Sequence, residues 1–369
     1  MKLTRIAQLG AITAVAALAL TGCAANEAAG ANATAPEDNG SMLSGTLSGM
    51  GASSMGAAQE AWITAFQTAH SDVTVNYAAE GSGAGREGFQ AGAADYAGSD
   101  RAFTLDEIAE GPFDGCTADS GIIQLPLYIS PIAVVFNLEG IDSLDLDADT
   151  IAGIFAGTIT DWNHPAIAAQ NPDATLPDLA ITPVHRSDDS GTTENFTDYL
   201  FQAAPSVWTW EADGVWPQTP VPGEAAAQTS GVIAAVTGGA GTIGYADASR
   251  AGDLGTVALK VGSEHVPFTA EAAAAIIDAS PLESGRESYD IAVELDRTSE
   301  AAGVYPIVLI SYTIACETYA DPAVAGLVKP YLEHLASTAG QDAAASAAGS
   351  APISDELRTK VDAAIALIS

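Results

Sequence analysis

One stretch of the chain, Val184 to Glu194, most constrains the fold, because it joins a strand pattern to a helix pattern through small polar residues. The apolar run Ile181 to Val184 precedes it, and the helical segment Phe196 to Phe201 follows it. A helix that starts directly after a strand presents unpaired backbone amides and the positive end of its dipole to the loop. The stretch therefore predicts an oxyanion site at a helix N-terminus.

Arg186 adds a fixed positive charge to this loop. Its planar guanidinium offers a two-pronged donor that fits a tetrahedral oxyanion better than a lysine ammonium does. The alternative is structural: Ser190 only caps a surface helix, and Arg186 pairs with Asp188 for solubility.

Three strand patterns near the start of the chain also end in polar residues. They cover Leu43–Leu47, Val73–Tyr77 and Tyr96–Asp100. The polar residues at or after their ends are Ser53, Ser54, Ser82 and Asp100. In an open α/β sheet ligands collect at the carboxyl ends of the strands, so we expect these side chains to line one site.

Helices are predicted between these strands. Apolar residues at three- and four-residue steps indicate a helix from Met55 to His70, with Ser53 and Ser54 at its N-cap. We expect Gly81–Gly85 to be a loop and Arg86–Ala91 to begin a helix.

Two long apolar runs divide the chain into two α/β lobes. The first consists of Ile122–Leu127 and Ile132–Phe136, interrupted by Ser130 and Pro131, and predicts a crossover strand out of the first lobe. Tyr305–Ile314 predicts the return strand. Lobe I is then residues 42–129 and 306–369, and lobe II is residues 130–305. The other predicted elements are helices Thr150–Ala156, Ala225–Thr237, Ala323–Leu335 and Asp355–Ile368, the strand Gly241–Tyr245, and a separating segment Ser337–Ser350.

The N-terminus has the pattern of an export signal. A basic start precedes the apolar run Ile6–Leu20, which is too short to span a bilayer. Leu20-Thr21-Gly22-Cys23 resembles a bacterial lipobox, which implies cleavage of residues 1–22 and a lipid on Cys23. The alternative is an ordinary secretory signal. Residues 23–41 are small and polar and predict a flexible tether.

The chain is strongly acidic, with 12 basic and 47 acidic residues and a formal charge of −35. Loss of Lys2 and Arg5 with the signal would leave 10 basic residues and move the charge to −37. Such a surface repels nucleic acid and anionic lipid headgroups. Because salt screens charges beyond about 8 Å, local donors in a closed pocket can still bind an anion.

Cysteine and histidine positions bound the remaining chemistry. With Cys23 lipidated, Cys116 and Cys316 remain, and two cysteines in an exported chain predict one disulfide. The five histidines are scattered, so we expect neither a metal nor a cofactor. Gly83, Gly85 and Gly88 match the dinucleotide pattern G-x-G-x-x-G, but a chain with 36 glycines matches it by chance easily.

Three motifs resemble those of the phosphate-binding proteins that serve high-affinity phosphate ABC importers. They are Gly51-Ala52-Ser53-Ser54, Gly81-Ser82-Gly83-Ala84-Gly85 with Ser99-Asp100 beyond, and Arg186-Ser187-Asp188-Asp189-Ser190-Gly191-Thr192. The chain departs from the family pattern at Ser54 and Met55, where the family usually has Phe and Pro.

The resemblance implies a two-lobed periplasmic-binding-protein-like fold of type II and a phosphate site without catalysis. It implies that the ligand is held by Ser53, Ser54, Ser82, Asp100, Arg186, Ser190, Gly191 and Thr192. Asp188 would orient Arg186. Asp100 would accept the proton that phosphate carries and sulfate lacks. The implied setting is an extracytoplasmic monomer, lipid-anchored to the cell membrane, that delivers phosphate to permease subunits.

Three other functions stay open. A related binding protein could take sulfate or molybdate. Asp189-Ser190-Gly191-Thr192 also spells an aspartic peptidase signature, but no second copy supplies the partner carboxylate. A phosphatase on the same lobes would need a metal cluster or a Ser-His-Asp order, and neither is evident.

Overall fold

A computed structural model describes residues 43–217 and 223–369 of the chain. The predicted signal (1–22), the lipidation site Cys23 and the tether (23–41) lie outside the described residues.

The first described elements alternate as strands and helices. Strand β1 (Gly45–Gly51) pairs in parallel with both β2 (Val73–Ala78) and β3 (Tyr96–Ser99). Helix α1 (Gly56–Ala69) follows β1, and α2 (Ser82–Gln90) follows β2. Because the three strands are parallel, their carboxyl ends meet at one edge, as predicted.

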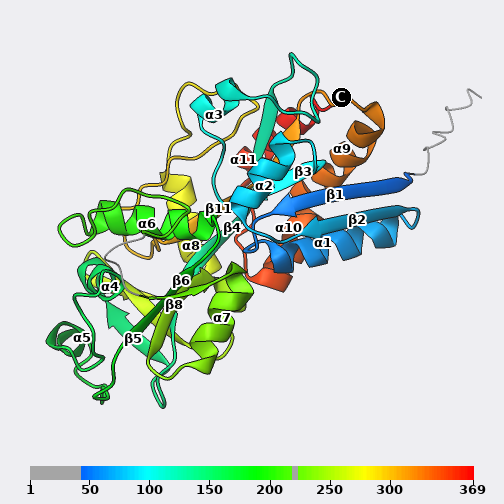
Figure 1. The fold of residues 1–369 in the computed structure, drawn as a ribbon. Helices are drawn as coiled ribbons and strands as arrows, with labels where there is room; N and C mark the ends of the chain where they lie inside the picture. Colours follow the sequence, from blue (N-terminus) through cyan, green and yellow to red (C-terminus); the bar gives the residue numbers. More distant parts are fainter. Residues whose placement is uncertain (1–42, 218–222) are drawn as a thin grey trace, which may run out of the picture. The chain divides into compact units, whose positions relative to one another are not determined.

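Helix α1 forms because its apolar residues recur on one face. Ala58, Trp62 and Phe66 are buried along it, as the three- and four-residue spacing predicted. The helix contacts β2, and Figure 1 shows the two side by side.

Two long strands connect the two halves of the sheet. Strand β4 (Ile122–Phe136) is buried along all 15 residues and pairs antiparallel with β11 (Val308–Cys316). Strand β11 also pairs with β3, whereas the last residues of β4 pair with β8 (Thr242–Asp247). A strand buried on both faces reads as a continuous apolar run, which is why both were visible in the sequence.

The middle of the chain builds the other half of the sheet. There β6 (Thr182–Arg186) lies between β8 and β7 (Glu224–Ala226), and all three are parallel. Helix α6 (Gly191–Ala203) follows β6, and α7 (Gln228–Gly238) follows β7. The remaining elements of this part are β5 (Ser143–Leu146), α4 (Ala148–Phe155), α5 (Pro165–Gln170), η1 (Ala248–Arg250), β9 (Gly255–Val261), β10 (Glu264–Val266) and α8 (Ala270–Ala279).

The C-terminal part is helical and packs beside the first strands. Helices α9 (Pro322–Ala336) and α11 (Asp355–Ile365) match the two predicted helices. The segment predicted to separate them, Ser337–Ser350, is itself mostly the helix α10 (Thr338–Ala348), so that prediction was wrong. Its many alanines favour a helix, and Ser337 caps it by accepting a hydrogen bond from Gly340 N.

Three helix starts also differ from the predictions. Helix α2 begins at Ser82 rather than Arg86, so most of the predicted glycine loop is helical. Those glycines are needed for close packing, since a Cβ on Gly85 would lie 2.5 Å from Gly51 Cα. Helix α7 begins at Gln228, because Glu224–Ala226 joins the sheet as β7. Helix α1 is preceded by Met55 and has no side-chain cap.

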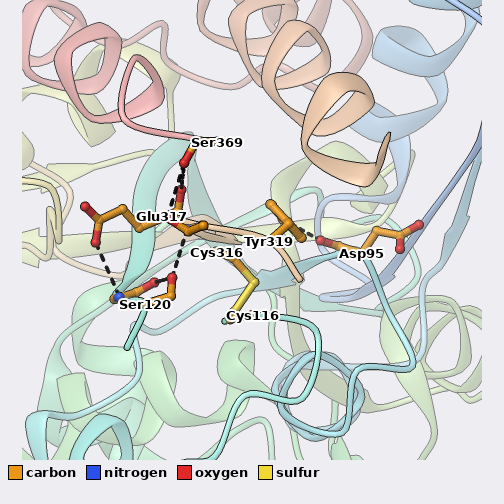
Figure 2. The surroundings of a disulfide bond; sticks show 9 residues. Asp95, Cys116, Ser120, Cys316, Glu317, Tyr319 and Ser369 are labelled. Atoms are coloured by element: carbon orange, nitrogen blue, oxygen red, sulfur yellow. Dashed lines mark hydrogen bonds between the residues drawn. A yellow bond between two sulfur atoms is a disulfide. The ribbon is translucent and has the colours of Figure 1, made fainter. Parts of the chain in front are cut away.

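The predicted disulfide between Cys116 and Cys316 is present (Figure 2). Cys316 is the last residue of β11, opposite Ile122 at the start of β4, and Cys116 lies just before β4. The bridge therefore ties the ends of both long strands together. The segment after Cys316 is held further by hydrogen bonds of Tyr319 to Ser369 O and to Asp95 O.

Within residues 43–217 and 223–369, no helix is both long and apolar enough to cross a membrane. The same residues contain no group of three or more acidic, histidine or cysteine side chains arranged to hold a metal ion. Helix α3 (Leu105–Glu110) follows β3, and Thr104 caps its N-terminus.

Candidate functional site

Arg186 ends β6 and is held rigidly by Asp188. The guanidinium is only 3% exposed, its Nε lies 2.8 Å from Asp188 Oδ1, and its Nη2 donates to Asp188 Oδ2. Asp188 Oδ1 also accepts a hydrogen bond from Gln228 N at 3.0 Å. Burial alone would raise the pKa of Asp188, but the paired guanidinium holds that pKa below its usual value.

The loop after Arg186 leads into the N-terminus of α6. Ser190 caps this helix, with its hydroxyl accepting from Thr193 N at 3.2 Å, and Gly191 and Thr192 form the first turn. A Cβ on Gly191 would lie 2.6 Å from Ser82 Oγ and 2.5 Å from Asp100 Cβ. Only glycine allows this close approach, which brings the start of α6 against Ser82 and Asp100.

Asp100 follows β3 and is bonded to side chains from three other segments of the chain. It is 3% exposed, and its carboxylate accepts hydrogen bonds from three hydroxyl groups. The donors are Ser54 Oγ at 2.6 Å, Ser311 Oγ at 2.6 Å and Thr192 Oγ1 at 3.0 Å. Burial raises the pKa of Asp100, and the three hydroxyls and the positive charge of Arg186 oppose that rise.

Ser82 and Ser53 complete the predicted set. Ser82, the first residue of α2, accepts a hydrogen bond from Asp100 N at 3.0 Å. The hydroxyl of Ser53 lies 3.0 Å from Thr229 Oγ1 and accepts from Thr229 N at 3.1 Å. Ser53 and Ser54 therefore do not cap α1, because both hydroxyls take tertiary partners instead.

Three polar residues next to the site were not predicted. Thr229 lies in the first turn of α7, Ser311 lies within β11, and Asn195 on α6 donates to Asp100 O at 2.7 Å. Ser311 carried a usable signal, since it is a hydroxyl residue inside the apolar run Tyr305–Ile314. Nothing in the sequence around Thr229 or Asn195 distinguishes these two residues from other polar residues in helices.

A cavity of about 300 Å³ adjoins Asp100. Its lining includes Arg101, Glu194, Asn195 and Arg297, and more carboxylates than cations. Arg297 is 3% exposed and donates to Asp198 Oδ2 at 2.9 Å, and Arg101 pairs with Glu194 at 3.0 Å. Because both cations are paired and carboxylates outnumber them, this cavity is poorly suited to an anion.

Aromatic residues pack near the backbone of Arg186. Tyr245 Oη accepts from Arg186 N at 3.3 Å, and Tyr245 stacks on Trp216 with ring centroids 5.9 Å apart. Trp216 also stacks on His185 at 4.8 Å. Burial lowers the pKa of His185, which favours a neutral ring, and its Nδ1 lies 2.9 Å from Arg186 O.

Comparisons with known proteins agree on one family. A family model described as a PBP superfamily domain matches residues 31–339. The chain is 33% identical to phosphate-binding protein PstS 3 of Mycobacterium tuberculosis over 377 aligned residues, which cover 100% of each chain. It is 30% identical to PstS 2 of the same species over 380 residues, again covering 100% of each chain.

Solved structures show the same fold at lower identity. A high-affinity periplasmic phosphate-binding protein, PfluDING with bound phosphate, superposes with a TM-score of 0.69 at 22% identity, covering 86% of this chain and 93% of that one. A phosphate-binding protein from Stenotrophomonas maltophilia gives 0.63 at 20%, with the same coverages. These likenesses confirm the predicted α/β class and the type II periplasmic-binding-protein-like fold.

Proposed function

The chain belongs to the PstS family of phosphate-binding proteins within the PBP superfamily, and we propose that it binds inorganic phosphate and delivers it to an ABC permease. One observation carries this proposal: the site contains one guanidinium, Arg186, held by Asp188, and one buried carboxylate, Asp100, that senses its charge. Hydroxyl groups and the start of α6 lie next to Asp100. The guanidinium attracts a dianion, and the carboxylate requires that the anion bring a proton.

The ligand would sit between two lobes that close on it. Lobe I comprises residues 42–129 and 306–369, and lobe II residues 130–305. In support, β1, β2, β3 and β11 pair with one another, while β6, β7 and β8 pair separately, and β4 joins the two sets. Ser53, Ser54, Ser82 and Asp100 would come from lobe I, and Arg186 and residues 188–192 from lobe II.

Hydrogen bonds across this division favour a closed state. Thr192 donates to Asp100, Ser53 contacts Thr229, and Gly83 N donates to Asp189 O at 3.3 Å. Each of these hydrogen bonds would connect one lobe to the other. In each, at least one partner is a predicted ligand residue or is adjacent to one in the sequence. A ligand that replaces or strengthens such contacts stabilises the closed state by its differential affinity for it.

Binding would rest on local donors rather than on the field of the whole chain. The donors would be the hydroxyls of Ser53, Ser82 and Ser190, the amides of Ser54, Gly191 and Thr192, and the guanidinium of Arg186. The Thr192 hydroxyl already donates to Asp100 and would act through that carboxylate. Amides at the start of α6 carry partial positive charge without adding a titratable group. This suits a chain with a formal charge of −35.

We propose a binder that performs no covalent chemistry. The curated relatives are named as phosphate-binding proteins. A phosphatase on this scaffold would release product from a chromogenic phosphate ester, and a peptidase would cleave an unfolded protein substrate. We expect neither activity from the purified chain.

The mature protein would begin at Cys23 and remain on the outer face of the cell membrane as a monomer. The lipobox-like residues before Cys23 support this, as does a disulfide, which persists in oxidising compartments. Replacing Cys23 with Ala should release the chain from the membrane fraction. Retention of the variant would contradict the lipid anchor.

Titration of the delipidated protein with phosphate and then sulfate, followed by tryptophan fluorescence, tests the proposal. Trp216 is linked to Arg186 through Tyr245, so ligand at Arg186 should change its emission. We expect a saturable signal with phosphate, a much weaker response with sulfate, and loss of most of the change in Trp216→Phe. A response to sulfate or molybdate alone would favour the alternative, a binding protein for those oxyanions.

A further inference from the structure

Ser311, which no sequence motif singled out, donates a hydrogen bond to Asp100 from within the long strand β11. We propose that Ser311 is a positioning residue that fixes which oxygen of Asp100 meets the ligand, and thereby sets discrimination between protonated and unprotonated tetrahedral oxyanions. This inference rests on the proposed function, since it concerns the same site.

The three hydroxyl donors are shared unequally between the two carboxylate oxygens. Ser54 and Ser311 both donate to Oδ1, each at 2.6 Å, and Thr192 alone donates to Oδ2. A carboxylate oxygen has two lone pairs, so Oδ1 is filled and Oδ2 keeps one free. The free lone pair on Oδ2 is the acceptor that remains for the proton of a bound anion.

Strand pairing explains why Ser311 reaches Asp100. Strand β11 is antiparallel to β3, with Tyr312 opposite Ser99, so the next residues along the two strands are Ser311 and Asp100. The register between β11 and β4 shifts between Ser311 and Tyr312. Such an irregularity re-aims the local side chains. Ser311 is completely buried, so bulk solvent does not reach its hydroxyl.

Loss of this donor would change both the orientation and the charge state of Asp100. The carboxylate would be free to rotate, and its pKa would rise further, because a hydrogen bond to the charged form lowers a carboxyl pKa. The other ionisable groups around Asp100 are Arg186, the Tyr77 phenol, and Arg101, Glu194, Asp198, Glu283, Glu294 and Arg297 of the adjoining cavity. A protonated Asp100 can donate to sulfate, which the ionised form rejects.

The test compares Ser311→Ala with Thr313→Val. Thr313 lies two residues further along β11, is equally buried, and its hydroxyl has no hydrogen-bond partner among the described residues. Both variants lose one buried hydroxyl from the same strand, but only one loses a bond to Asp100. The dissociation constants of phosphate and sulfate are measured by calorimetry between pH 5 and pH 8.

In Ser311→Ala we expect phosphate affinity to fall about tenfold and the ratio of phosphate to sulfate affinity to fall at least as much. Sulfate binding should also appear at a higher pH than in the wild type, whereas Thr313→Val should match the wild type. A ratio and pH profile unchanged in Ser311→Ala would overturn the inference. A wild type that does not prefer phosphate would instead overturn the proposed function.

If Ser311→Ala does not fold, judged by its near-ultraviolet circular dichroism, Ser311→Cys takes its place. A thiol has similar volume but donates only weakly. We expect a partial loss of the phosphate preference, and full retention would overturn the inference.

Discussion

The side-chain oxygens of Ser53 and Thr229 lie 3.0 Å apart, although 176 residues separate them in the chain. Thr229 N also donates to Ser53 Oγ, and the preceding residue, Gln228, donates its N–H to Asp188. The first turn of α7 therefore contacts a predicted ligand residue that follows β1 and the carboxylate that holds Arg186. Gln228 adopts a φ of 62°, which costs free energy in a residue with a side chain and marks this turn as constrained.

Replacing Thr229 with Val should weaken the closed state. The variant keeps the shape of the side chain and the backbone N–H but loses the hydroxyl that faces Ser53. We expect the dissociation constant for phosphate to rise about threefold to tenfold, mostly through faster dissociation. Stopped-flow fluorescence measures both rates, and Thr237→Val, at the exposed far end of α7, is the control. Equal dissociation rates in the two variants would argue against a closing contact.

Arg186→Lys should weaken phosphate binding at least tenfold. Lysine retains the charge but lacks the planar fork that Asp188 holds by two hydrogen bonds. Calorimetry measures the dissociation constant, with Arg250→Lys as a control at an exposed arginine. An unchanged constant in Arg186→Lys would remove the guanidinium geometry from the site.

Removing the disulfide should reduce stability without changing the site. The bridge closes a loop with a sequence separation of 200 residues. Such a loop contributes about 5 kcal/mol in the chain-entropy model. The double variant Cys116→Ser, Cys316→Ser should unfold at a lower urea concentration while binding phosphate normally. An unchanged urea midpoint would show that the bridge contributes little.

The buried carboxyl of Asp247 should make stability depend on pH. Burial raises its pKa to about 6, against hydrogen bonds from Ser249 and Tyr128. The folded chain then binds a proton that the unfolded chain, with an ordinary pKa near 3.8, does not bind between pH 4 and 6. The contribution of Asp247 to the free energy of unfolding therefore increases as the pH falls through this window.

Asp247→Asn isolates that contribution, because it keeps an acceptor but cannot titrate. Urea unfolding at pH 7 and pH 5 should show a gain on acidification in the wild type that exceeds the gain in Asp247→Asn by about 1 kcal/mol. Identical pH dependence in the two proteins would mean that Asp247 titrates normally.

Much of this arrangement was predictable because parallel strands deliver their carboxyl ends to one edge. Ser82 and Asp100 follow the parallel strands β2 and β3, and Asp100 N donates to Ser82 Oγ. Thr192 follows β6 in the other half of the sheet, so this rule did not predict its hydrogen bond to Asp100. The glycine and serine pattern around Arg186 also predicted a helix N-terminus, which α6 provides. Local sequence patterns predicted the structure where a single strand, its loop and the following helix determine the geometry.

Other features depend on pairings between distant segments, which no local pattern encodes. Ser311 reaches Asp100 because β11 pairs with β3 in one register. Ser53 and Ser54 have the composition of a helix cap, yet their hydroxyls bond Thr229 and Asp100. Helix α10 was missed because its small residues also suit a linker, and its packing against α1 decides between the two.

Isothermal titration calorimetry of the wild-type protein with phosphate and sulfate at neutral pH tests the central claim most directly. We predict that phosphate binds far more tightly, because sulfate has no proton to offer Asp100, and that Asp100→Asn narrows the difference. Equal affinities of the wild type for the two anions would contradict the assignment of Asp100 as the residue that selects phosphate.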